Sequence, residues 1–365
     1  MTYPPMRHLT LDDVDRLSAG VSFLASGGGG DPLLPVQMLR HSLLQRGPVT
    51  LIDAADLDDD AVVLPVVMGG TPSAVVEAFP GRSEILLLRE VIERHLGRPC
   101  AAILPMQMGP VNGLFPIVVA AELDLPCIDA DLMQRCFPAL EMTFLTLAGF
   151  PLSPIYMVGS SGSYSIMRAG SEQSGSNLLR ATLTEMGMVA VVSAYEITAR
   201  DVRAHGSAGA LSRGIELGRL VLDMESGDDH AVERCLAACD GRIVFEGTVV
   251  EVVHEVTAGT ANAVVTVFGE NRADTSVDIL RLDQQSENLI ATLNGTPVTT
   301  VPDIISVLDA ETGSVVQNTS LSRGQHIRVV AAPGDRRWHT DEAAALIGPR
   351  VFGFDIDPVS VGYRE

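Results

Sequence analysis

The chain has 365 residues, of which 46% are hydrophobic and 19% charged, and its net charge is −21. This composition predicts a globular protein with a large core, and the length favours two domains. The negative charge argues against nucleic acid or an anionic membrane as a partner, because both require clustered positive charge. We therefore expect a small-molecule substrate, and a homo-oligomer is left open.

All 25 basic residues are arginines, and lysine is absent from the sequence. A Schiff-base lysine is thus excluded, and with it pyridoxal phosphate as a cofactor and the lysine-containing phosphate loop. The five cysteines are too few for a disulfide framework in a chain of this length. Neither a long apolar run nor a signal peptide is visible, so the sequence predicts a cytoplasmic protein.

The first part of the chain alternates helical patterns with short apolar runs. This predicts an α/β domain over 1–170 with a mostly parallel sheet. The expected elements are a helix that begins at Thr10, a helix over 32–45, strands over 61–68 and 100–104, a helix over 114–124 and a strand over 126–131.

The second part of the chain changes to a strand-rich pattern, which predicts a smaller, mixed but mainly β domain over 171–365. The Gly/Ser-rich stretch 159–177 is expected to be the connection between the domains. Helices are expected over 176–187 and 208–240, the latter with Ser207 as its cap, around an apolar strand. From residue 242 onward, β-branched runs alternate with turn residues.

Polar residues follow each of the three expected parallel strands. Ligands of open α/β sheets bind beyond the carboxyl ends of such strands, and Asp129 stands at one of them. A carboxylate at this position can serve as a base or a metal ligand. The alternative left open is that Asp129 and Asp131 cap the next helix, with Arg135 paired to one of them.

The stretch SGGGG contains four consecutive glycines, Gly27, Gly28, Gly29 and Gly30. A dinucleotide fingerprint would need glycine where Pro32 stands, so that interpretation is weak. Four glycines allow positive φ and a close approach of a ligand to backbone N–H groups, which predicts an anion or carbonyl site. A tight structural turn is the alternative. The histidines show no metal-binding spacing, and a divalent metal is left open.

Several motifs occur in a fixed order along the chain. They are SGGGGDP, GPVNGLFP at 109–116, LPCIDADLMQRCFPALEMT at 125–143, VPDII at 301–305 and GPRVFGFD at 348–355. In this order they resemble the S-methylthiohydantoin desulfurase family, bacterial proteins associated with hydantoin-degrading enzymes. The resemblance covers nearly the whole chain and implies an α/β N-terminal domain followed by a smaller β-rich one.

The resemblance also implies an activity, namely a hydrolase that acts on a small cyclic amide or thioimidate and releases a thiol and a hydantoin. Asp129 or Asp131 would activate water, and Arg135 would orient the acid or bind a substrate carboxylate. The implied substrate-binding residues are Gly27, Gly28, Gly29, Gly30, Asn112 and Gly113, and the family pattern also includes Phe137 and Pro138.

Two positions depart from the family pattern. Gln107 and Ala139 stand where relatives carry acids, so two carboxylates are missing. If these acids serve the chemistry of relatives, the activity here differs from theirs. The alternative function is therefore a non-catalytic binding or regulatory subunit associated with hydantoin-degrading enzymes.

Overall fold

The computed structural model describes residues 7–70, 72–228, 230–257, 260–270 and 277–364. The chain forms two compact units, which we name after their sheets. The mixed-sheet unit contains Thr2–Ser18 and Gly30–Arg213, and the antiparallel unit contains Ala19–Gly29 and Gly214–Glu365. The domain boundary expected after residue 170 stays a prediction.

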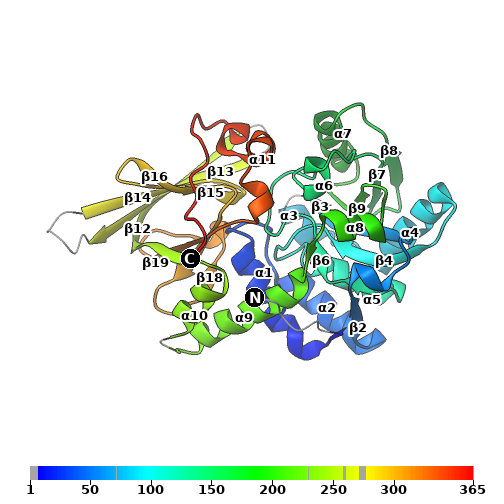
Figure 1. The fold of residues 1–365 in the computed structure, drawn as a ribbon, viewed down its shortest axis with the longest axis horizontal. Helices are drawn as coiled ribbons and strands as arrows, with labels where there is room; N and C mark the ends of the chain where they lie inside the picture. The colour runs from blue at the N-terminus through cyan, green and yellow to red at the C-terminus, as the bar shows by residue number, and fades with distance from the viewer. Residues whose placement is uncertain (1–6, 71, 229, 258–259, 271–276, 365) are drawn as a thin grey trace. The chain divides into compact units, whose positions relative to one another are not determined.

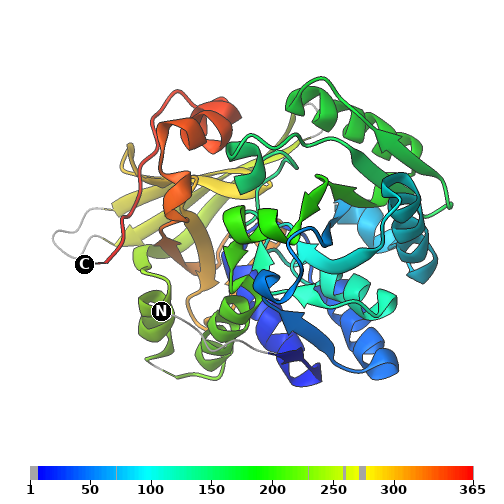
Figure 2. The same cartoon turned by 45° about the vertical axis from the view of Figure 1, so that its right-hand side comes forward.

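A nine-stranded sheet, counted over the described residues, is the centre of the mixed-sheet unit (Figures 1 and 2). Across the sheet the order is β1 (His8–Leu9), β2 (Val49–Ile52), β5 (Cys127–Ile128), β4 (Cys100–Pro105), β3 (Val62–Gly70), β9 (Val189–Ala194), β7 (Ile155–Gly159) and β8 (Tyr164–Met167), while β10 (Ile197–Thr198) pairs with β3. β2, β5, β4 and β3 are parallel neighbours, and the other pairings are antiparallel. The sheet is therefore mixed, and the expectation of a mostly parallel sheet was wrong.

Part of the antiparallel half of this sheet comes from residues that were not expected to form a strand. The Gly/Ser-rich stretch expected as a connection contains β8 and the start of α7 (Glu172–Glu185). β8 alternates exposed and half-buried residues at the edge of the sheet, so it lacks the apolar run of a central strand. The apolar strand expected near 188–194 is β9, and it pairs with β3 and β7.

Helices surround the mixed sheet. They are α2 (Leu33–Arg46), α3 (Pro72–Glu77), α4 (Arg82–Leu96), α5 (Phe115–Leu123), α6 (Phe144–Leu147), α7 and α8 (Ala199–His205). The boundary between the two units falls within α1 (Val14–Leu24). α2 follows Pro32 and ends before Gly47, which has a φ of 87°, so the predicted boundaries are confirmed within one residue. α5 packs on α2, β3 and β4 and is buried nearly all around, which explains its uniformly apolar sequence.

The antiparallel unit is built on an eight-stranded sheet, as counted in the described ranges. Its order is β16 (Thr296–Thr300), β15 (Glu287–Leu293), β14 (Val277–Gln285), β13 (Thr260–Glu270), β12 (Arg242–Thr257), β19 (His326–Ala332), β17 (Ile304–Asp309) and β18 (Val315–Val316). All of these pairings are antiparallel. The strand-rich pattern expected after residue 242 is confirmed.

The antiparallel unit has a core on one face of its sheet, and it also contains helices. Val249, Val265, Leu282, Ile305 and Val329 are among the buried residues on one face of the sheet. The single helix expected over 208–240 is two helices, α9 (Ala210–Glu225) and α10 (Ala231–Ala238), and α11 (Asp341–Ile347) follows the sheet. The chain bends between α9 and α10 near Gly227. Its φ is 85°, an angle that glycine adopts without strain but that other residue types rarely adopt.

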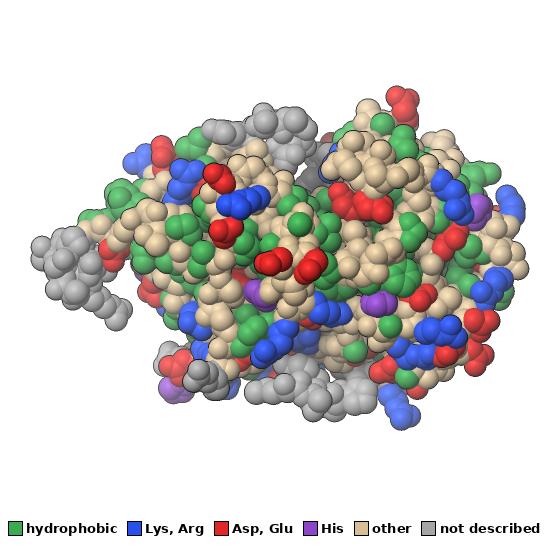
Figure 3. Space-filling model, turned by 45° about the horizontal axis from the view of Figure 1, so that its top comes forward, with side chains coloured by type: hydrophobic (Ala, Val, Ile, Leu, Met, Phe, Trp, Pro, Cys, Tyr) green, Lys and Arg blue, Asp and Glu red, His purple; other side chains and the backbone are tan. Residues whose placement is uncertain are grey.

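Charged side chains are interspersed on the surface. In the view of Figure 3, arginines lie beside acidic residues rather than forming a continuous basic patch. Arg200 and Arg203, for example, both pair with Asp59. Exposed pairs of this kind contribute little to stability, because water and salt screen their charges. Over the described residues, no helix has the length and hydropathy needed to cross a membrane.

Candidate active site

The loops after β3, β4 and β5 lie at one edge of the mixed sheet, because the three strands are parallel neighbours. Hydrogen bonds join these loops to one another. The side chain of Asn112 accepts the N–H of Met68 at 2.7 Å and donates to its carbonyl at 3.4 Å. The N–H of Leu132 donates to the carbonyl of Met106 at 3.1 Å. The carboxyl ends of the three strands thus lie at one edge of the sheet, as predicted, and there the loops after β4 and β5 contact each other beside the end of β3.

Asp131 is fully buried among these loops. Its Oδ2 accepts the N–H of Met133 at 3.1 Å and the N–H of Gln134 at 2.5 Å. The short strand β6 (Ala130–Asp131) also pairs with β11 (Ser207–Ala208). The turn and the strand pairing together fix the carboxylate, and a carboxylate fixed in this way can act as a general base or hold a cation.

Asp129 is half-buried and caps the N-terminus of α9. Its Oδ1 accepts the N–H groups of Leu211 at 2.8 Å and Ser212 at 3.1 Å, and its Oδ2 accepts the hydroxyl of Ser212 at 2.5 Å. The N–H of Gly209 donates to the carbonyl of Asp129 at 2.7 Å. The carboxylate thus satisfies backbone donors that a helix N-terminus leaves open.

The helix that Asp129 caps is not the one expected from the sequence. The alternative interpretation placed the cap on the next helix, but α6 is capped by Thr143, whose hydroxyl accepts the N–H of Thr146 at 3.2 Å. The expectation that Ser207 caps the helix near 208 was also wrong, because Ser207 lies in β11. A cap supplied from 82 residues away leaves no local sequence signal.

Arg135 is 1% exposed and lies in the third loop. Its Nε donates to the carbonyl of Cys136 at 3.0 Å, and its guanidinium lies 5.0 Å from the centroid of the Phe137 ring. This is the geometry of a cation–π contact. The N–H of Phe137 donates to Oε1 of Gln107 at 3.4 Å. Gln107 therefore joins the second loop to the third.

The glycine stretch adopts unusual backbone angles. The φ values are 79° at Gly27, 79° at Gly29 and 83° at Gly30. A Cβ atom at Gly28 would lie 2.5 Å from Oε1 of Glu287, and the carbonyl of Gly27 accepts the N–H of Asn318 at 2.9 Å. Glycine is thus required here for close packing within the antiparallel unit, which supports the structural-turn alternative.

The residues around this turn include buried polar side chains. Asn288 is fully buried, and its N–H donates to the carbonyl of Ser26 at 2.7 Å. Gln284 donates through Nε2 to Oδ1 of Asn288 at 2.8 Å and to Oδ1 of Asn318 at 3.1 Å. Glu287 is 2% exposed beside them. The sequence signal for these buried polar residues is the run QQSEN, which lies between apolar strand residues.

The predicted site residues divide between the two units. Gly30, Asn112, Gly113, Asp129, Asp131 and Arg135 belong to the mixed-sheet unit, and Gly27, Gly28 and Gly29 belong to the antiparallel unit. A shared hollow that contains both the acids and the glycine turn stays a prediction. Within the described part of the chain, no group of three or more His, Cys, Asp or Glu side chains is arranged as a metal site.

Comparisons with known proteins agree with this architecture. One similar solved structure is the X-ray structure of a protein from Chromobacterium violaceum, from a structural genomics consortium. The two sequences are 22% identical, and the TM-score of the two structures is 0.80. The match covers 98% of this chain and 100% of that chain. This likeness shows the fold alone. No curated protein matches the chain. Family models described as the S-Me-THD-like N-terminal and C-terminal domains match residues 12–169 and 171–361. The chain therefore belongs to the S-Me-THD-like family.

Proposed function

We propose that this protein is a hydrolase of a small cyclic thioimidate or amide, such as an S-methylthiohydantoin. Family membership supports the substrate class. The observation that carries the proposal is the buried carboxylate of Asp131, held where three loops meet at the carboxyl ends of parallel strands. Ligand sites of α/β sheets occur at such edges.

The reaction needs one activated water molecule. Water adds to the ring carbon that bears the S-methyl group, and its proton passes to a base. The adjacent ring nitrogen takes up a proton, and the carbon–sulfur bond then breaks. The added hydroxyl loses its proton and becomes the ring carbonyl, and the thiolate takes up that proton and leaves as methanethiol. Asp131 is the favoured base in our assignment, because it lies at the carboxyl ends of the parallel strands, whereas the carboxylate of Asp129 caps the N-terminus of α9.

The other predicted residues support this chemistry in different ways. We assign Asn112 a positioning role, since its amide holds the end of β3 through Met68. Arg135 contributes a buried positive charge in the third loop, which we propose balances negative charge that develops on the substrate. The N–H groups of Gly28 and Gly113 already donate to the carbonyls of Ala25 and Gly109, so the N–H of Gly30 is the proposed donor to the ring in the mixed-sheet unit.

The experiment is a thiol-release assay on the purified full chain. The substrates are S-methylthiohydantoins, with unmethylated thiohydantoins and hydantoins as controls. Each assay is run on the protein as isolated, after treatment with a chelator, and after addition of Mg²⁺, Mn²⁺ or Zn²⁺. We expect thiol release only from the S-methylated compounds.

The same assay tests the alternative function. Gln107 carries no charge where relatives have an acid, and its amide only joins two loops. This favours a non-catalytic binding subunit as the second candidate. Calorimetric binding of an S-methylthiohydantoin without thiol release in any of the metal conditions would support that subunit and would exclude the hydrolase.

A further inference from the structure

The mixed-sheet unit contains a groove of about 540 Å³ that is lined by residues of α2, α4 and α5. α5 packs against both other helices. This helix begins directly after the candidate active-site loop that contains Asn112, whereas Glu122 in the groove stands at the other end of its nine residues. At 1.5 Å per residue, the groove acid lies roughly 10 Å along the helix axis from that loop. The groove is therefore separate from the candidate active site.

Two arginines share one carboxylate in this groove. Nη2 of Arg46 donates to Oε2 of Glu122 at 3.2 Å, and Nε of Arg82 donates to the same oxygen at 3.1 Å. Oε1 of Glu122 accepts the hydroxyl of Ser42 at 2.8 Å. Glu122 is the single acid among the described residues of the lining. Two positive charges therefore face one negative charge, and one of them has no counter-ion within the groove.

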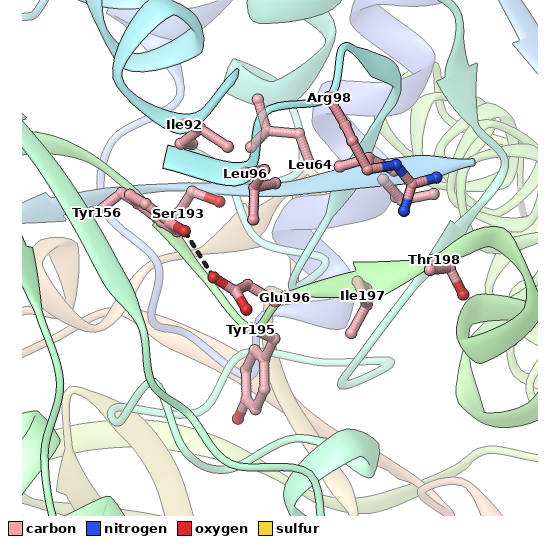
Figure 4. A pocket seen from close by; sticks show the side chains of 12 residues that line it. Leu64, Ile92, Leu96, Arg98, Tyr156, Ser193, Tyr195, Glu196, Ile197 and Thr198 are labelled. Atoms are coloured by element: carbon pink, nitrogen blue, oxygen red, sulfur yellow. Dashed lines mark hydrogen bonds between the residues drawn. The ribbon is translucent and has the colours of Figure 1, made fainter. Parts of the chain in front are cut away.

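A smaller cavity of the same unit, of about 270 Å³, shows a different arrangement (Figure 4). Its wall includes Tyr195, whose φ of 62° is rare for a bulky side chain. The carboxylate of Glu196 faces Tyr156 and accepts its hydroxyl at 2.9 Å. Arg98 pairs with the carboxylate of Asp60 at 3.2 Å. Each charged side chain there has a partner of its own, so the excess of positive charge is a property of the groove.

The two guanidinium groups of the groove are close enough to contact one anion. Because both donate to Oε2 of Glu122, at 3.2 and 3.1 Å, Nη2 of Arg46 and Nε of Arg82 lie at most about 6 Å apart. A tetrahedral oxyanion that accepts N–H groups on two sides, at about 2.8 Å each, spans about 8 Å. One such anion can therefore bridge both arginines while Glu122 keeps its contacts.

Arg82 has one complete edge of its guanidinium available for an anion. Its contact with Glu122 uses Nε, and within the described residues Nη1 and Nη2 have no acceptor. Nε and Nη1 of Arg46 likewise have no acceptor there. The side chains of Arg46 and Arg82 are 43% and 51% exposed, so an anion can reach them from solvent. Arg82 can thus bind two oxygens side by side, and Arg46 can bind a third.

This set of donors favours a phosphate group over a carboxylate. A carboxylate has two oxygens in one plane, which a single guanidinium edge satisfies, whereas a phosphate monoester has three free oxygens and up to two negative charges. The volume of about 540 Å³ corresponds to roughly 18 water molecules at about 30 Å³ each, which is more than a phosphate fills. Gln37, His41 and Gln45 line α2 at intervals of four residues, and their polar groups can bind hydroxyls.

We propose that this groove binds the phosphate monoester of a small hydroxylated molecule. The phosphate bridges Arg46 and Arg82 beside Glu122, and the hydroxylated part contacts the polar side chains of α2. The site is separate from the proposed hydrolase site and does not depend on that activity.

Calorimetric titration of the full chain with ribose 5-phosphate, at low ionic strength, tests the proposal. Ribose lacks the phosphate, and ribonate carries a carboxylate in place of a phosphate. We expect ribose 5-phosphate to bind and both analogues to bind at least about tenfold more weakly, since each loses charge-assisted contacts to an arginine. Arg46→Gln and Arg82→Gln should each weaken the binding of ribose 5-phosphate by a similar factor.

A matched variant controls for the change in net charge. Arg94→Gln removes an exposed arginine of α4 that pairs with Glu90 and does not line the groove, so it should bind ribose 5-phosphate with the wild-type affinity. Wild-type affinity in both Arg46→Gln and Arg82→Gln would overturn the proposal. Absence of binding to the wild type, or equal binding of ribose 5-phosphate and ribonate, would do so as well, and these comparisons do not depend on whether any variant folds.

Discussion

Asp131 in the mixed-sheet unit and Asp303 in the antiparallel unit are both fully buried, yet their surroundings differ. Oδ2 of Asp131 binds N–H groups within its own turn. The carboxylate of Asp303 instead accepts the hydroxyl of Ser360 at 2.9 Å and the N–H of Val361 at 2.7 Å, and thus holds a segment nearly 60 residues away.

The C-terminal segment has further contacts to the same region. The N–H of Thr300 donates to the carbonyl of Val359 at 2.8 Å, and Thr299 donates to Oδ2 of Asp303 at 3.1 Å. Burial alone therefore does not identify a catalytic acid. The distinction lies in position, because Asp303 joins distant segments of an antiparallel sheet, whereas Asp131 lies at the carboxyl end of parallel strands.

The largest expected effect follows from replacing Asp131. Asp131→Asn keeps an oxygen that can accept the N–H groups of its turn, but removes the proposed base. Turnover in the thiol-release assay should fall by a factor of about 10² to 10⁴, which is the usual contribution of a general base to the rate. The matched control is Asp303→Asn. If Asp131→Asn folds and retains its rate, the assignment of the base is wrong.

The second effect is on stability rather than turnover. Asp303→Asn weakens the charged hydrogen bonds that hold the C-terminal segment, which should lower the free energy of unfolding by about 2 kcal/mol. Urea denaturation measures this loss, and hydrogen exchange at the N–H of Val361 should become faster. The kcat for thiol release should remain unchanged. Loss of turnover without loss of stability would contradict the structural role.

The smallest effect is expected at Asp129. Asn is as good a helix cap as Asp, so Asp129→Asn should cost less than about 1 kcal/mol of stability. Turnover should fall by no more than about tenfold, because the cap on α9 is retained and Asp131 remains. Denaturation and kcat measured on the same preparation check both values. A decrease as large as that in Asp131→Asn would make Asp129 the base instead.

The local elements of the fold were largely predictable. The helix after Pro32, the strands over 61–68 and 100–104, and the β-rich pattern after residue 242 all rest on short-range periodicity and on Pro and Gly boundaries. The convergence of three loops at one edge followed from the parallel order of their strands. The sequence thus predicted that Asp129, Asp131 and Arg135 follow the carboxyl end of a buried strand, and in the structure they follow β5.

The partners of those residues were decided by tertiary structure. The cap of α9 by Asp129 spans 82 residues, and the hydrogen bond from Ser360 to Asp303 spans 57. Edge strand β8 was missed because its half-exposed residues resemble a loop, and the strain at Tyr195 arises only once β9 is paired and Tyr195 is held by Leu152. Periodicity reports which face of an element is apolar, whereas hydrogen bonds between distant segments depend on how the elements pack, which no local pattern records.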